Sequence, residues 1–142
     1  MEEAKKTQGK TSASSVGPDR TEAAKAFAIE AARLAANTRC HNVVVLDVRG
    51  VCPVADFFVI ASGTSARQMR TVMDEIQELG DQKNFSPLAR SGYEGESWML
   101  LDCVDVLVHV FDDMSRHYYD LDGLWGDAKQ VRWQEAAAEA AR

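Results

Sequence analysis

The chain has 142 residues, enough for one domain with one hydrophobic core, and its content of 46% apolar and 27% charged residues is ordinary for a globular protein. Its net charge of −6 argues against binding nucleic acid through phosphates, which requires clustered lysine and arginine. The acids concentrate between Ser91 and Asp127, where Arg116 is the only Lys or Arg. The nine acids of this region are Glu94, Glu96, Asp102, Asp105, Asp112, Asp113, Asp120, Asp122 and Asp127. They suit either a solvated face or a surface that attracts a basic protein.

The cysteines and the hydropathy pattern bear on location. Cys40, Cys52 and Cys103 are odd in number and have no C-x-x-C spacing, which predicts free thiols in a reducing compartment. The N-terminal region has no apolar signal segment, and no apolar run approaches the roughly 20 residues of a membrane span. We therefore expect a soluble, cytoplasmic protein.

The first half of the chain predicts a tail, a helix and two strands. Residues 1–18 contain almost no large apolar residue, which predicts a disordered tail. Alanine-rich residues 21–37 have apolar side chains at helical spacing, with Asp19 as the expected N-cap. The β-branched and apolar runs at 42–48 and 56–62 predict strands, and their short linker allows an antiparallel pair.

A second helix is predicted after Ser62-Gly63-Thr64-Ser65. Ser65 and Gln68 have capping-box spacing, and Gly80 is placed to end the helix. The apolar stripe of this helix consists of Met69, Val72, Met73, Ile76 and Leu79.

The second half predicts a short edge strand at 87–89, a strand pair over Trp98–Cys103 and Val106–Phe111, and a short helix that begins at the Asp112-Asp113 pair. Residues 128–142 are rich in Ala and Glu and predict a tail. We therefore expect residues 19–127 to form a single domain. The order of elements predicts an α/β fold with a mixed sheet of four or five strands flanked by helices.

Two features bear on phosphate and metal chemistry. Backbone N–H groups of the Ser62–Ser65 turn suit a phosphate, but a capped turn with one glycine explains them as well and is the favoured interpretation. Nucleotidyl transfer with Mg²⁺ needs two or three carboxylates that converge. Asp102 and Asp105 flank a turn and Asp112-Asp113 are adjacent, so these carboxylates need not converge.

The histidines and cysteines suggest packing before catalysis. His109 shares a strand face with Leu107 and Phe111, where a packed, hydrogen-bonded histidine is the common case. Cys40-His41 with Cys52 resembles part of a zinc site, but a fourth ligand at suitable spacing is missing. We therefore expect no catalytic residue, metal or cofactor.

A surface for a protein partner is the stronger hypothesis. The segment from Asp112 to Trp125 mixes aromatic residues with carboxylates, and aromatics anchor interfaces while carboxylates select cationic partners. Tyr118 and Tyr119 are adjacent on a short helix, so both cannot face one buried side. At least one of them is expected to be exposed.

Three separated strings carry a resemblance to a known family. They are Ala55–Ser65 (ADFFVIASGTS), Asp105–Phe111 (DVLVHVF) and Tyr118–Trp125 (YYDLDGLW). Together they resemble the ribosomal silencing factor family, also called Iojap, in the family's order. The resemblance implies a nucleotidyltransferase-like fold without transferase activity. It also implies binding to protein fourteen of the large ribosomal subunit, which blocks association with the small subunit and represses translation under nutrient limitation. The family is also associated with homodimers.

The resemblance assigns partner-binding residues. Trp98 matches the family's aromatic at the start of the strand pair, Tyr119-Asp120-Leu121 its docking segment, and Asp122 its next acid. It implies that Trp98, Tyr119 and Leu121 are apolar anchors, and that Asp120 and Asp122 pair with Lys or Arg of the partner.

Two positions depart from the family pattern. Val104 stands where the family usually has glycine, which predicts strain if the turn there needs a positive φ. Gly123 replaces a larger residue and is expected to loosen the docking segment.

Two other functions remain open from the sequence. One is a Mg²⁺-dependent, nucleotidyltransferase-like enzyme, which would bind nucleotide and metal near Ser62–Ser65. The other is a ribosome-assembly adaptor that binds the same surface and leaves subunit joining intact.

Overall fold

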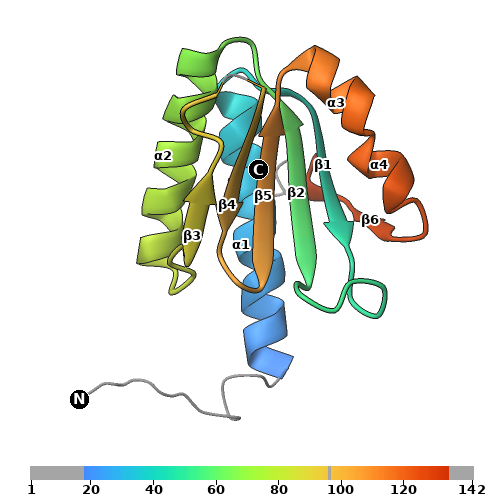
Figure 1. Cartoon of the computed structure of the whole chain (residues 1–142). Coiled ribbons are helices and arrows are strands. Elements are labelled where there is room, and N and C mark those ends of the chain that lie inside the picture. Colours follow the sequence, from blue (N-terminus) through green and yellow to red (C-terminus); the bar gives the residue numbers. More distant parts are fainter. Residues whose placement is uncertain (1–17, 96, 135–142) are drawn as a thin grey trace.

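The computed structural model describes residues 18–95 and 97–134, which form an α/β fold with a six-stranded mixed sheet. The elements along the chain are α1 (Pro18–Asn37), β1 (His41–Asp47), β2 (Phe57–Ser62), α2 (Ala66–Gln82), β3 (Ala89–Ser91), β4 (Trp98–Asp102), β5 (Val106–Phe111), α3 (Asp113–Tyr119), α4 (Leu121–Leu124) and β6 (Lys129–Val131). The strand order is β3-β4-β5-β2-β1-β6 (Figure 1). The central strands β2 and β5 run parallel, and the other neighbours pair antiparallel, including β1 with β2 as expected.

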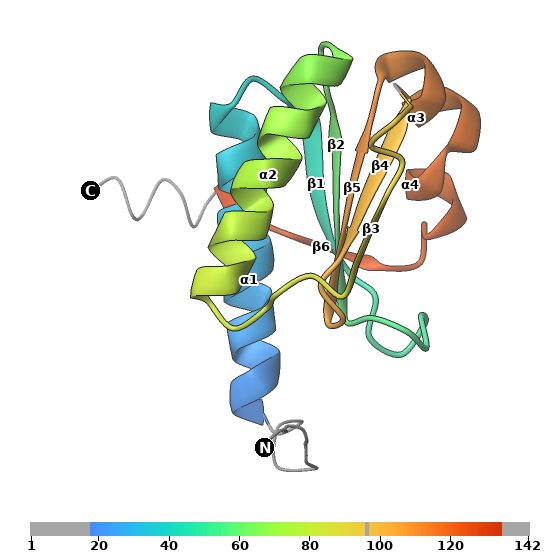
Figure 2. The same cartoon turned by 60° about the vertical axis from the view of Figure 1, so that its left-hand side comes forward.

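The period of two along each strand divides the buried side chains between two cores. Phe57 and Val59 of β2 face α1 and α2, whereas Phe58 and Ile60 face the side of α3 and α4. All six residues of β2 are buried, because both faces of this strand are covered. Figure 2 shows the two long helices on one face of the sheet and the two short helices on the other.

The two long helices use different packing devices. The alanines of α1 let its backbone lie close to the sheet, and its Phe27 stacks on Phe85 with ring centroids 5.1 Å apart. On α2 the predicted stripe is confirmed, since Met69, Val72, Met73 and Ile76 are fully buried and Leu79 packs against them. The Ser65 side chain accepts a hydrogen bond from the Gln68 N–H, as the capping interpretation predicted.

The predicted end of α2 at Gly80 was wrong, because the helix continues to Gln82. Asn84 takes the left-handed conformation instead, with φ of 66°, and the Phe85 N–H donates to the Gly80 carbonyl at 2.8 Å. A Cβ on residue 80 would lie 2.5 Å from the Phe85 carbonyl oxygen. Glycine is therefore needed here for the close approach of the returning chain.

The sheet is larger than the predicted four or five strands. The additional strand β6 pairs with β1, with Val45 opposite Val131, and so lies beyond residue 127, where the sequence placed the end of the domain. The Trp133 indole N–H continues this contact by donating to the Val43 carbonyl at 3.0 Å. Strand β6 has only three residues, two of them exposed, and so short a run has no hydrophobic periodicity from which a strand can be predicted.

The predicted N-terminal tail lies outside the described residues except for Pro18, which begins α1 and is a residue type favoured in the first helical turn. The predicted C-terminal tail lies outside them only from residue 135 onward, and its residues 129–131 form β6 instead. Within the described ranges, every helix is too short or too polar to cross a membrane. Cys40, Cys52 and Cys103 are free thiols, as predicted.

The turn between β4 and β5 confirms the positive φ considered for Val104. Its φ is 71°, and the Asp105 N–H donates to the Cys103 carbonyl at 2.9 Å, which makes a γ-turn centred on Val104. The Asp102 carboxylate accepts the Val104 N–H at 2.9 Å and supports the turn. A β-branched residue is strained in this region of conformational space.

Replacing Val104 by glycine should therefore raise the free energy of unfolding by about 1 kcal/mol, since the relief of strain exceeds the added entropy of the unfolded chain. Denaturant unfolding measures the change. Val104→Ala is the matched control, because it removes the same exposed apolar groups but keeps the Cβ. An equal gain in both variants would contradict strain at this residue.

Candidate partner-binding surface

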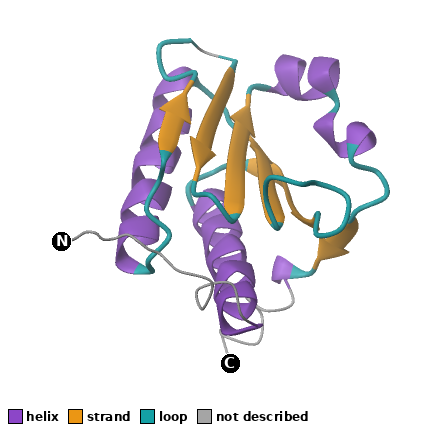
Figure 3. Ribbon diagram, turned by 60° about the horizontal axis from the view of Figure 1, so that its bottom comes forward, coloured by secondary structure: helices purple, strands orange, loops and turns teal. Residues whose placement is uncertain are grey.

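The segment α3–α4 crosses the second face of the sheet directly after β5. Asp112 is the N-cap of α3 and its carboxylate accepts the Ser115 N–H at 2.8 Å, which confirms the predicted start of this helix. Figure 3 shows the short helices on the side of the sheet opposite α1 and α2. The covering segment is short, so this face of the sheet carries the partly exposed aromatic residues.

An aromatic cluster joins three elements on this face. The antiparallel register places Trp98 of β4 opposite Phe111 of β5, with ring centroids 4.9 Å apart. Tyr119 of α3 packs on Trp98 with centroids 4.8 Å apart and remains 46% exposed. The structure thus brings together Trp98 and Tyr119, which the sequence proposed separately.

His109 lies beneath this cluster, on the face shared with Phe111 as expected. Its Nδ1 accepts a hydrogen bond from the Trp98 indole N–H at 3.2 Å, and its ring packs edge-on against Phe58. Burial lowers the pKa of His109 to about 4. The link to Trp98 was missed from the sequence, although aligning the two strands about their turn would have placed both residues on one face.

Leu121 differs from the expectation of a direct apolar anchor. Its side chain is 8% exposed and belongs to the core beneath α4, together with Phe58 and the partly buried Trp125. Trp125 meets Phe58 edge-on with centroids 5.4 Å apart. Leu121 therefore fastens the segment to the sheet, and its neighbours present the apolar surface.

Asp122 likewise has a partner inside the chain. Its carboxylate accepts two hydrogen bonds from the Arg116 guanidinium, both at 2.9 Å, and Arg116 also donates to the Ser62 hydroxyl at 3.0 Å. The hydrogen bonds from Arg116 hold the pKa of Asp122 below its ordinary value. The expected pairing of Asp122 with a partner's Lys or Arg is thus replaced, in the free protein, by a link from α4 through α3 to the end of β2.

Asp120 differs from Asp122 in being exposed. It adopts φ of 47° between α3 and α4, and accepts the Gly123 N–H on its side chain at 3.2 Å. A Cβ on residue 123 would lie 2.4 Å from the Asp120 carboxylate, so glycine leaves room for this cap. The departure at Gly123 is therefore coupled to the position of Asp120.

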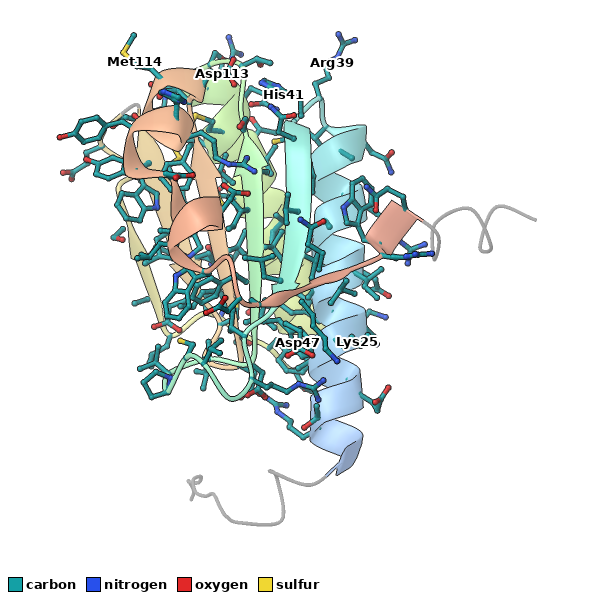
Figure 4. The ribbon with its side chains drawn as sticks, turned by 90° about the vertical axis from the view of Figure 1, so that its right-hand side faces the viewer. Lys25, Arg39, His41, Asp47, Asp113 and Met114 are labelled. Atoms are coloured by element: carbon teal, nitrogen blue, oxygen red, sulfur yellow. The ribbon has the colours of Figure 1, made fainter. Side chains whose placement is uncertain are left out.

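Further apolar side chains extend the surface beyond the predicted residues. Met114, Tyr118 and Leu124 are 82%, 79% and 71% exposed. Tyr118 and Tyr119 are both exposed, as the sequence predicted for at least one of them, and their rings meet edge-on with centroids 5.0 Å apart. Figure 4 shows Met114 pointing away from the body of the molecule. Met114 and Tyr118 are four residues apart, the spacing of one helix face, but the sequence does not reveal that this face is uncovered.

Several of the nine acids have local partners. Asp113 accepts from His41 Nε2 at 2.6 Å, which ties the start of β1 to α3 (Figure 4), and Asp105 pairs with Arg20 at 2.7 Å. Asp102 and Asp112 accept backbone N–H groups. The ion pairs of Asp105 with Arg20 and of Asp122 with Arg116 offset part of the negative charge of the nine acids, whereas Asp102 and Asp112 keep theirs. The four carboxylates considered for Mg²⁺ serve separate structural roles, and within the described ranges no group of three or more His, Cys, Asp or Glu suits a metal ion.

Removing the Asp122 carboxylate should destabilise the protein, because it leaves the largely buried Arg116 guanidinium without its anion. We expect Asp122→Ala to lower the free energy of unfolding by about 2 kcal/mol, less than a fully buried pair because Asp122 is partly exposed. Asp127→Ala, at an exposed acid three residues past α4, should change the free energy of unfolding by less than about 0.5 kcal/mol.

The same comparison has a pH signature. A carboxyl whose pKa is lowered on folding contributes its full stability above the unfolded value, near 3.8, and loses it as the pH falls through the lower folded value. The difference between wild type and Asp122→Ala should therefore shrink as the solution is acidified below pH 3.8. A difference that stays constant would contradict the ion pair as its source.

Comparison with known proteins places this architecture in a family. The family model described as "Ribosomal silencing factor during starvation" matches residues 21–142. A ribosomal silencing factor of Halalkalibacterium halodurans is 38% identical over 93 residues, which cover 66% of this chain and 80% of that protein. The chloroplastic protein Iojap of Arabidopsis thaliana is 31% identical over 106 residues, covering 75% and 44%.

A solved structure has a similar fold. A crystal structure from Chromobacterium violaceum superposes with a TM-score of 0.67 at 27% identity, covering 75% of this chain and 86% of the other. Because the family model spans well over half of the sequence, the resemblance seen in the three sequence strings is confirmed. The chain belongs to the ribosomal silencing factor family.

Proposed function

We propose that this protein represses translation by binding protein fourteen of the large ribosomal subunit and sterically blocking association with the small subunit when nutrients are scarce. The exposed aromatic surface around Trp98 and Tyr119 carries the proposal, because it lies on the docking segment that the family resemblance indicates. Family membership supports a role in silencing translation. The named partner and the steric mechanism are the proposed part.

The chemistry of the surface suits a basic protein. Tyr119, Tyr118 and Met114 offer apolar area that a partner would remove from water, and aromatic anchors of this kind dominate the affinity of many interfaces. Exposed Asp120 lies beside them and offers a carboxylate to a Lys or Arg. In this proposal Trp98 and Tyr119 are direct anchors, whereas Leu121 and Asp122 hold the segment in place.

The proposal assigns no catalysis to the protein. The fold would be nucleotidyltransferase-like in its sheet, but the Ser62–Ser65 turn at the end of β2 has structural partners: Ser65 caps α2, and a Cβ on Gly63 would lie 2.2 Å from the Met69 side chain. Ser62 accepts from Arg116. These contacts support a turn that serves packing. The proposal needs neither metal nor cofactor.

The remaining features implied by the resemblance stay within the proposal. The protein would act in the cytoplasm, where ribosomal subunits join. It would also form homodimers, and direct readout of nucleic acid would play no part in its binding.

Tyr119→Ala should weaken binding to isolated large subunits by about 2 kcal/mol, roughly 30-fold, because truncation removes an interface ring and the support of Trp98. Co-sedimentation at graded protein concentrations measures the affinity. Tyr119→Phe keeps the ring and should keep most of the affinity. Val54→Ala, at an exposed apolar residue in the loop between β1 and β2, is the control outside the surface.

Wild-type affinity in Tyr119→Ala would remove this residue from the interface. Absence of large-subunit binding by folded wild-type protein would contradict the proposed function, and titration with nucleotide and Mg²⁺ would then test the enzyme alternative. Binding that leaves subunit joining intact would favour the assembly adaptor.

A further inference from the structure

His109 makes a directional contact with a surface residue that its burial alone does not require. The Trp98 indole N–H donates to His109 Nδ1 at 3.2 Å, while His109 itself is only 6% exposed. The Trp98 ring in turn packs against the Tyr119 ring, with ring centroids 4.8 Å apart. A chain of contacts therefore runs from the buried imidazole through the indole to an exposed tyrosine.

The hydrogen bond determines which ring nitrogen carries the proton. Because Nδ1 accepts from Trp98, the neutral imidazole must hold its hydrogen on Nε2. That Nε2 is buried and has no hydrogen-bond partner among the described residues. The lowered pKa of His109 keeps the ring neutral, and therefore able to accept at Nδ1, over the physiological range.

A buried N–H without an acceptor destabilises a folded protein, so an apolar side chain would be the more stable choice at this position. The surroundings of His109 are themselves apolar, since it packs between Phe58 and Phe111 and pairs along the sheet with Ile60. A histidine at this position is thus poorly suited to an apolar core, but its Nδ1 is well suited to accept the hydrogen bond from the Trp98 indole. Groups that reduce stability and serve a neighbour in this way occur at functional sites.

We propose that His109 is a positioning residue of the docking surface, whose Nδ1 holds the Trp98 indole in the orientation on which Tyr119 packs. This contact depends on the pairing of two strands, because the register of β4 with β5 places Trp98 opposite Phe111, two residues from His109. The effect of His109 on ribosome binding rests on the proposed function. The effect of His109 on the orientation of Trp98 concerns the free protein alone.

The test begins on free, full-length protein with the indole N–H resonances of its three tryptophans, assigned by the Trp98→Phe variant. His109→Phe keeps an aromatic ring but removes the acceptor. It should shift the Trp98 resonance and speed exchange of its indole hydrogen by about tenfold or more, because a hydrogen bond no longer protects it. The resonances of Trp125 and Trp133 should stay in place. His109→Asn, whose side-chain oxygen lies near the position of Nδ1, should restore protection.

Affinity and stability separate positioning from simple packing. His109→Phe should unfold at the same or higher denaturant concentration than wild type, yet bind large subunits about tenfold more weakly. In a Trp98→Phe background the same change should cause no further loss, because His109 then has no indole to hold. His109→Leu repeats the comparison with a smaller side chain.

The outcomes are distinct. An unchanged Trp98 resonance in both apolar variants overturns the proposal, as does failure of both variants to fold, which would make His109 a structural residue. An equal loss of affinity in the Trp98→Phe background also overturns it. A Trp98 resonance that responds to His109 in a protein without affinity for large subunits supports the positioning and contradicts the proposed function.

Discussion

The structure depends on unequal cover of the two faces of one sheet. The parallel central pair, β2 and β5, must be buried on both sides, because their side chains are apolar in both directions. Two long helices cover one face over its central strands. The other is covered by α3 and α4, which span only Asp113–Leu124, and by the loops that flank them. Trp98 of β4 is therefore only partly buried on that face, and together with the exposed Tyr119 of α3 it forms the candidate surface.

The α3–α4 segment is too short to be held in position by buried apolar area alone. Leu121 and Trp125 supply apolar contacts with the sheet, and the Arg116 guanidinium links Asp122 to Ser62 at the end of β2. These buried attachments let Tyr119 present a ring at the surface in a fixed place. Several conspicuous residues of the docking string thus act from the inside, and the exposed ones depend on them. The caps serve the same purpose, because Asp112 starts α3 and Asp120 both ends α3 and starts α4.

Much of this arrangement could be predicted from the sequence, because it depends on local patterns. The stripe of α2, the cap at Ser65, the strand pair and the helix start at Asp112 all follow from spacing and residue type. Strand β6 could not, since it depends on the edge that distant β1 offers. The end of α2 could not either, since Phe85 returns over Gly80 and the chain turns at Asn84, a residue type that does not require this conformation. Among the site residues, the pairing of Trp98 with Tyr119 and the internal roles of Leu121 and Asp122 required the three-dimensional register. An acid in a motif does not show from its spacing whether it faces a partner or an arginine of its own chain.

The central claim is that a protein seated through this surface prevents the ribosomal subunits from meeting. Light scattering of subunit joining, with large subunits first loaded with the protein and small subunits then added, tests it most directly. The account predicts that joining falls in proportion to the fraction of large subunits occupied, and that Tyr119→Ala shifts this dependence to higher protein concentration. Large subunits that are fully occupied and still join at the normal rate would contradict it.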